Sequence, residues 1–170
     1  MNITGLEKYH KVVAKILEIL KKNNCWFEIF EHEEVRTSEE AVKTRTGYTL
    51  HQGAKAIIIR VKKSESDKKF IMLVLPADLR FDNDKVKKFF GAKDIRFAIG
   101  EEVSELTDGV QAGGVPPFGN LFGLETVVDP KLFEMEKIVF NAGDRRFSVA
   151  MKSKNYKDLV NPAVETITEN

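Results

Sequence analysis

The sequence predicts an α+β (mixed α/β) fold with a largely antiparallel sheet. Apolar runs typical of strands come in groups, and segments with helical periodicity are scattered among them. A doubly wound parallel sheet would need a regular alternation of strands and helices, which is missing here. The chain has neither an internal repeat nor a low-complexity linker, so we expect one domain over residues 1–170.

The N-terminal quarter predicts a helix, a strand and a second, shorter helix. Apolar residues recur at helical spacing over residues 6–22, and residues 26–31 (WFEIFE) alternate as a strand. The tetrapeptide 37-TSEE-40 has the pattern of a capping box. Thr37 is therefore expected to cap a short helix that Gly47 can terminate.

A buried β-hairpin is expected in the middle of the chain. The β-branched run 54–62 and the apolar run 70–75 are separated by the polar segment 64-SESDKK-69. This pattern is typical of two central antiparallel strands joined by a turn.

The remaining segments alternate between helix, strand and loop. Asp82 can cap a helix over 84–90 that Gly91 stops. The other expected elements are a strand at 95–99, helical turns at 101–107, a loop at 109–120, strands at 121–128, 136–141 and 145–151, and a final helix that Ser153 caps and that ends near Pro162. The last two strands are expected to turn near Gly143, and the C-terminal residues to be frayed.

Composition excludes several classes of protein. No stretch approaches the ~20 apolar residues needed to span a bilayer, and the N-terminus lacks the apolar core of a signal peptide, so we predict a cytosolic protein without a membrane partner. Cys25 is the only cysteine, and His10, His32 and His51 have no metal-binding spacing. With no GxGxxG and no Walker A motif either, we expect neither a metal nor another cofactor.

The charge balance limits the kind of nucleic-acid contact. The net charge is only +1, so we expect no DNA partner and at most contact with a strand end. Lysines outnumber glutamates over residues 8–22, which indicates either a solvated helix face or a weak phosphate-steering surface.

Lys55 is the first candidate for a functional role. It begins a strongly apolar strand and shares a face with Ile57 and Ile59. A lysine in this position either extends from the strand end into solvent or points into a pocket.

The second candidate is the loop 113-GGVPPFG-119. Its glycines allow close approach to a ligand, and Pro116 and Pro117 stiffen the path. Exposed N–H groups at Gly113 and Gly114 could bind an oxyanion. The alternative is a structural turn that plugs the sheet with Phe118.

Other candidates have strong structural alternatives. Thr37 already serves as a helix cap, and His32 either lines a pocket or ends a strand. Cys25 could be a nucleophile, but a lone cysteine is more often core filling. The hairpin 141-NAGDRRFS-148 brings polar side chains together, although a plain hairpin needs no function.

Four ordered segments resemble the YbaK/prolyl-tRNA-synthetase-associated editing domain. They are 32-HEEVRTSEEA-41, 53-GAKAIIIRV-61, 76-PADLRFDNDKVKKFFGAKDIRFA-98 leading to 109-GVQAGGVPPFG-119, and 140-FNAGDRRFSV-149. The resemblance covers residues 26–160. It implies a central mixed, largely antiparallel sheet or barrel surrounded by helices, and it implies hydrolysis of the ester in a mischarged aminoacyl-tRNA of the tRNA(Pro) type.

The resemblance also implies a set of site residues. Lys55 and Gly114 match the positions that carry the reaction. The implied substrate-binding residues are His32, Thr37, Gly113, Pro116, Pro117, Phe118, Gly119, Asn141, Gly143, Arg145 and Ser148. Family members that clear alanine tend to have histidine at the position of Arg145, and cysteine-clearing members an acid at that of Ser148, so the amino acid stays open.

An activated ester suits this residue set, because water can attack it without a protein nucleophile. Backbone N–H groups of the glycine loop would stabilise the oxyanion, and Lys55 would hold the tRNA 3′ end. A synthetase is a further possible partner. Two other hypotheses are a non-catalytic module that binds a tRNA end or an amino acid, and a thiol enzyme that uses Cys25.

Overall fold

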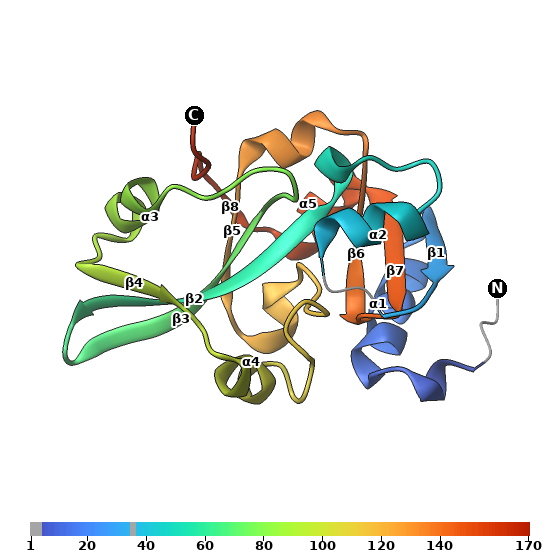
Figure 1. The fold of residues 1–170 in the computed structure, drawn as a ribbon, viewed down its shortest axis with the longest axis horizontal. Coiled ribbons are helices and arrows are strands. Elements are labelled where there is room, and N and C mark those ends of the chain that lie inside the picture. Colours follow the sequence, from blue (N-terminus) through green and yellow to red (C-terminus); the bar gives the residue numbers. More distant parts are fainter. Residues whose placement is uncertain (1–4, 35–36) are drawn as a thin grey trace.

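The fold consists of two β-sheets that enclose the main hydrophobic core. The computed structural model describes residues 5–34 and 37–170. The five-stranded sheet has the order β4-β2-β3-β5-β8, and the three-stranded sheet the order β1-β7-β6. Figure 1 shows the long β2–β3 hairpin projecting to one side and the three-stranded sheet on the other. The predicted α+β class is confirmed.

The larger sheet is mixed and the smaller one is antiparallel. β2 pairs antiparallel with β3 and β4, whereas β5 pairs parallel with β3 and β8. The strands are β1 (Phe27–Glu31), β2 (Ala54–Ser64), β3 (Asp67–Pro76), β4 (Asp94–Phe97), β5 (Glu125–Val128), β6 (Lys137–Asp144), β7 (Phe147–Lys152) and β8 (Ala163–Val164). A parallel bridge between Gly53 and Val139 joins the two sheets where β2 begins.

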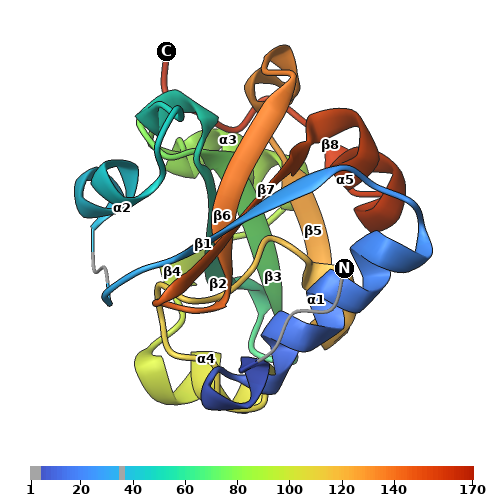
Figure 2. The same cartoon turned by 90° about the vertical axis from the view of Figure 1, so that its right-hand side faces the viewer.

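Helices surround the two sheets. They are α1 (Lys11–Lys22), α2 (Ser38–Thr44), α3 (Asn83–Phe90), α4 (Gly100–Leu106) and α5 (Ser153–Val160), with 3₁₀ turns η1 (Leu6–Lys8), η2 (Leu50–Gln52), η3 (Gly119–Phe122) and η4 (Pro130–Glu134). In Figure 2 the three-stranded sheet lies in front of the larger one, with α1 beside it. In the part of the chain that the structure describes, no helix is both long and apolar enough to cross a bilayer.

The core lies between the two sheets, and a second cluster lies under α3. The first cluster joins α1 to the inner faces of both sheets, as with Ile16, Met72 and Phe140. Burial of such side chains contributes about 1.5–3 kcal/mol each, which makes this cluster the main stabilising element. The second cluster packs the opposite face of the large sheet against Val86 and Phe90 of α3.

Several predicted elements are confirmed. The β2–β3 hairpin forms, and the Asp82 side chain accepts hydrogen bonds from the first turn of α3, which Gly91 ends in the left-handed region at φ 63°. Thr37 caps α2 by accepting from the Glu40 N–H at 3.1 Å. That helix ends at Thr44, before the predicted Gly47.

The predicted helix over 6–22 is wrong in its first turns. Tyr9 is extended, with φ −103° and ψ 168°, and separates η1 from α1. His10 caps α1 because its Nδ1 accepts from the Val12 N–H at 3.1 Å. Histidine is not among the residues usually found at helix N-caps. The apolar periodicity therefore predicted one helix that continues across His10.

Three predictions near the C-terminal hairpins also need correction. The predicted strand 121–128 begins only at Glu125, because η3 takes the preceding residues. The β6–β7 turn falls at Arg145 and Arg146, while Gly143 sits in a bulged part of β6 at φ 113°. Ser153 is the first residue of α5 rather than its cap, and its hydroxyl donates to the Met135 carbonyl.

The C-terminal tail is docked, contrary to the prediction of a frayed end. The backbone N–H groups of Ile167 and Thr168 donate to Asp129 Oδ2 at 2.9 and 3.0 Å. Both residues are fully buried. Burial acts to raise the pKa of the Asp129 carboxyl, but these hydrogen bonds and one from Lys131 N–H outweigh it and lower the pKa.

Candidate functional site

A cavity of about 350 Å³ opens between the start of β2 and the loop before η3. Its walls combine small apolar residues with a few polar ones. Of the residues predicted from sequence, four line it: Thr37, Lys55, Gly113 and Asn141. The size lies at the lower end of the range for small-molecule sites, which suits a small ligand group.

Lys55 is one of the residues that line this cavity. Its Nζ donates to the Leu79 carbonyl at 2.9 Å, which fixes the half-buried side chain against the segment after β3. Burial lowers the pKa of Lys55, Arg80 nearby lowers it further, and Asp78 and Glu39 act in the opposite direction. An ammonium has three N–H donors, so two remain for a ligand.

The edge of β2 beside the cavity is open. Pairing with β4 begins only at Ile59, and the last contact along that edge is the Ala98 N–H donating to the Ile58 carbonyl at 3.0 Å. Alternate residues of a strand direct their backbone groups to the same edge. Ala56 therefore directs its N–H and C=O to the edge of β2 at a point where no described strand pairs with it. Ala56 also lines the cavity.

The glycine loop is held against the β6–β7 hairpin through its carbonyl groups. Asn141 Nδ2 donates to the Gly113 carbonyl at 2.7 Å, and Gly143 N–H donates to the Gly114 carbonyl at 2.9 Å. Arg145 Nε donates to the Ala112 carbonyl at 2.7 Å. These bonds keep Gly113, at φ 90°, in the cavity wall.

Only one of the two expected oxyanion donors is available. The Gly114 N–H donates to the Gln111 carbonyl at 2.9 Å, so the expectation that it binds an oxyanion is wrong for this conformation. Gly114 instead permits close packing, since a Cβ there would lie 3.4 Å from the Arg145 N. The Gly113 N–H has no hydrogen-bond partner within residues 5–34 and 37–170, so it can serve a ligand.

Arg45 is a cavity residue that sequence reasoning missed. Its side chain is buried (6% exposed), and no ion pair of Arg45 occurs in the described part of the chain. Nε donates to Ser148 Oγ and Nη2 donates to Asn141 Oδ1, both at 3.0 Å. Burial lowers the pKa of Arg45 to about 10, so the group is still a cation at neutral pH.

Ser148 and His32 form the layer behind Arg45. His32 Nδ1 lies 2.8 Å from the Glu33 carbonyl, and its Nε2 lies 2.8 Å from Ser148 Oγ. The carbonyl can only accept, so Nδ1 carries the proton and a neutral His32 accepts the Ser148 hydroxyl proton at Nε2. Both residues thus position Arg45 from behind, and neither lines the cavity.

Because His32 is neutral in the folded protein, we expect the free energy of unfolding to depend on pH. Burial lowers the pKa of His32 below 6.5, Arg45 adds to this, and the Glu33 carbonyl and Asp144 oppose it. Between the two pKa values the unfolded chain binds more protons, so the free energy of unfolding should fall as pH drops below 6.5. Urea unfolding of wild type and His32→Asn between pH 7.5 and 5.5 measures this, and we expect the variant to show the shallower slope. Equal slopes would contradict the neutral assignment.

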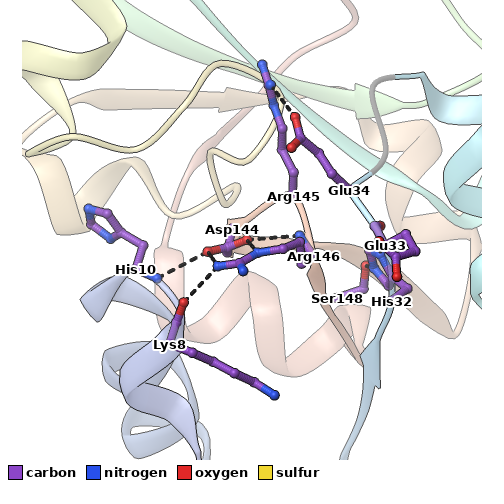
Figure 3. A network of polar contacts seen from close by, with 9 residues as sticks. All are labelled: Lys8, His10, His32, Glu33, Glu34, Asp144, Arg145, Arg146 and Ser148. Atoms are coloured by element: carbon purple, nitrogen blue, oxygen red, sulfur yellow. Dashed lines mark hydrogen bonds and ion pairs between the residues drawn. The ribbon is translucent and has the colours of Figure 1, made fainter.

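Arg145 and its neighbours lie on the outer side of the loop. Figure 3 shows Arg145 reaching Glu34, at 2.8 Å, while Arg146 pairs with Asp144 and donates to the Lys8 carbonyl. His10 N–H also donates to Asp144, at 3.2 Å. Arg145 therefore braces the loop from outside this cavity. With Gly143 it lines a second hollow of about 410 Å³, so contact of these two residues with substrate stays a prediction.

The double-proline segment also lies behind the cavity. Pro116, Pro117, Phe118 and Gly119 are buried and do not line it. The ring of Phe118 packs at 5.5 Å from Tyr156, whose hydroxyl donates to the Pro117 carbonyl. These contacts agree with the alternative of a structural turn plugged by Phe118.

Cys25 does not belong to the cavity. It follows α1, packs against the main core and is not among the lining residues. Burial raises the pKa of its thiol, with a smaller contribution from Asp158 in the same direction. A thiol with a raised pKa, away from the cavity, does not fit the hypothesis of a thiol enzyme.

Comparison with known proteins identifies similar sequences and folds. A family model for the aminoacyl-tRNA editing domain matches residues 32–159. The multifunctional Ser/Thr-tRNA deacylase ProXp-y of Escherichia coli (strain K12) is 34% identical over 161 residues, which cover 94% of this chain and 95% of that protein. The uncharacterized protein YwhH of Bacillus subtilis (strain 168) is 31% identical over 122 residues, which cover 72% and 73%.

The fold is shared with a solved structure described as a putative trans-editing enzyme for prolyl tRNA synthetase. The TM-score is 0.77 at 22% sequence identity, and the match covers 95% of this chain and 99% of that one. The fold expected from the resemblance is thereby confirmed.

Proposed function

This chain belongs to the aminoacyl-tRNA editing domain family and is a hydrolase of the aminoacyl-tRNA ester bond, and from this premise we propose that it removes serine or threonine from mischarged tRNA in trans. The observation that carries the proposal is Arg45, a buried donor group in a cavity otherwise lined largely by small apolar residues. The similar Escherichia coli protein is described as acting on Ser/Thr-tRNA, which supports the same substrate class.

Arg45 would select for a side-chain hydroxyl. Its Nη1 makes no hydrogen bond to any described residue, and Arg45 lines the cavity. An aminoacyl group with a hydroxyl oxygen satisfies this buried donor, whereas alanine leaves it unpaired. Sites built to hydrogen-bond a hydroxyl discriminate strongly against the analogue that lacks it.

The ester would be hydrolysed by water without a protein nucleophile. The carbonyl oxygen lies toward the N–H groups of Ala56 and Gly113, which stabilise the negative charge as water adds to the carbonyl carbon. The bond to the ribose oxygen then breaks, and that oxygen takes a proton. The neighbouring ribose hydroxyl of the substrate orients the attacking water.

Lys55 would hold the 3′-terminal nucleotide by its phosphate. The bond to the Leu79 carbonyl fixes the ammonium at the cavity wall, so it acts as a positioned point charge. The tRNA(Pro)-type carrier, a synthetase partner and a cytosolic location stay predictions from sequence.

A panel of mischarged tRNAs tests the substrate assignment. Serine, threonine, alanine and cysteine are each attached to tRNA(Pro) and to the tRNA that normally carries them, and release of the free amino acid is timed. We expect serine and threonine to be released fastest. Preferred release of alanine would contradict the role of Arg45. Tight tRNA binding with no release above the blank would favour the non-catalytic module.

A further inference from the structure

The two most exposed large hydrophobic side chains of the described residues stand beside the cavity. Phe97 is 63% exposed and Ile99 57% exposed, at the end of β4 and just before α4. The other large exposed aromatic side chains, Trp26 and Phe89, do not line the cavity. The ring of Trp26 lies under the Lys137 ammonium at 4.4 Å, and Phe89 packs on Phe90.

Phe97 lies at the mouth of the cavity on the same face of the sheet as Lys55. It pairs with Ile59 across β2 and β4, so the two side chains share a face, and Lys55 lies on that face four residues earlier in β2. Phe97 and Ala98 both line the cavity. Figure 1 shows β4 running beside β2 and leading into α4.

The ring is held in place by neighbours that leave much of it open. The Phe81 ring supports it edge-on, with centroids 5.6 Å apart. Arg96 Nη1 donates to the Phe97 carbonyl at 3.0 Å and to Glu102 at 2.8 Å, which ties the end of β4 to α4. A rigid, exposed aromatic ring next to a cavity offers a flat surface with little ordering cost on binding.

We propose that Phe97 is a stacking platform for the 3′-terminal nucleobase of the tRNA substrate. The proposal rests on the proposed function, because the ester in the cavity and the base on Phe97 belong to one nucleotide. Lys55, which would hold the phosphate of that nucleotide, and the position opposite Phe97 are about 13 Å apart along β2 on one face of the sheet, so the nucleotide and the two side chains together span this distance. Aromatic side chains bind unpaired bases by stacking, and this contact does not depend on the base sequence.

The position of the ring favours a base over the amino-acid side chain. Ala56 and Ala98 are small lining residues that leave space for a small aminoacyl group, whereas the Phe97 side chain, which also lines the cavity, is 63% exposed to solvent. A near-neutral protein also needs a non-electrostatic contact to a strand end, since it cannot rely on many phosphate contacts.

The test compares Phe97→Ala and Phe97→Trp with wild type on two substrates. One is seryl-tRNA, and the other is serine ethyl ester, which has no nucleobase. We expect Phe97→Ala to lower kcat/KM on the tRNA ester by about tenfold or more, to leave the ethyl ester unchanged, and Phe97→Trp to retain activity. Phe89→Ala, an exposed phenylalanine on α3, is the matched control and should match wild type.

A binding experiment separates this proposal from the proposed function. Adenosine 5′-monophosphate should quench the fluorescence of the indole introduced by Phe97→Trp, but not that of Trp26 in the wild type. Quenching in a protein without deacylase activity would support the platform while the proposed function fails. No quenching, or an equal loss by Phe97→Ala on both substrates, would overturn the platform.

Discussion

Replacing Lys55 with methionine should lower kcat/KM for an aminoacyl-tRNA by about a hundredfold or more. Methionine keeps most of the apolar stem and removes the ammonium, so the tRNA end loses the group that fixes the ester beside Gly113. The effect should appear mainly in kcat, because a loosely held ester spends little time near the Ala56 and Gly113 N–H groups. Timed release of amino acid under single-turnover conditions measures it.

The control is a lysine on the same strand outside the cavity. Lys63 is exposed near the far end of β2, so Lys63→Met should leave kcat/KM unchanged. Stability provides a second check, since Lys55 is half-buried and burial lowers its pKa. Removing this charge relieves a cost of folding, so Lys55→Met should unfold at no lower urea concentration than wild type. Full activity in Lys55→Met would refute the role assigned to the ammonium.

Elements whose signals are local were predicted well. The Asp82 cap, the Gly91 stop and the two apolar runs of β2 and β3 depend on residues close together in sequence, and each occurs as expected. The docked C-terminal tail depends on Asp129, which is 38 residues before Ile167. No local sequence pattern indicates such a long-range contact. The polar residues near the C-terminus were therefore predicted to be frayed.

The difference between local and long-range signals also explains which residues of the cavity were predicted from sequence. Lys55 and Gly113 stand out because a cation in an apolar strand and a glycine-rich loop are unusual in themselves, and both line the cavity. Arg45, in 44-TRTG-47, has no such signal. Its burial depends on Asn141 and Ser148, 96 and 103 residues later in the chain.

For Gly114, in contrast, the predicted role of its N–H as an oxyanion donor was wrong for this conformation. The sequence pattern cannot distinguish an N–H that faces a ligand from one that closes a turn. In the fold it closes a turn with Gln111 and allows the hairpin to approach.

Arg45→Met should lower kcat/KM on seryl- and threonyl-tRNA by about a hundredfold. The variant removes the only buried cation that lines the described cavity, and with it the donor for the substrate hydroxyl. On alanyl-tRNA the loss should be much smaller, since alanine makes no bond to this group. Rates on the three esters, measured in parallel, give the comparison.

Stability should change little in Arg45→Met, which distinguishes a functional arginine from a structural one. Burial lowers the pKa of Arg45 to about 10, so the folded protein carries a cost for this charge at neutral pH. When the guanidinium is removed, Ser148 Oγ and Asn141 Oδ1 each lose one donor, and water in the cavity that Asn141 lines can donate to Asn141 Oδ1 in its place. The lost bonds and the relieved burial cost then offset each other, and we expect a change within about 1 kcal/mol in the free energy of unfolding.

Arg45→Lys separates charge from geometry. Lysine keeps the positive charge but lacks the planar group that reaches Ser148, Asn141 and the cavity at once. If the arginine acts by geometry, this variant should be nearly as inactive as Arg45→Met on serine and threonine esters. Recovery of wild-type rates with lysine would mean that charge alone suffices. A fall of more than about 3 kcal/mol in the methionine variant would instead identify Arg45 as part of the structural core, since that exceeds the usual cost of unpaired buried polar groups.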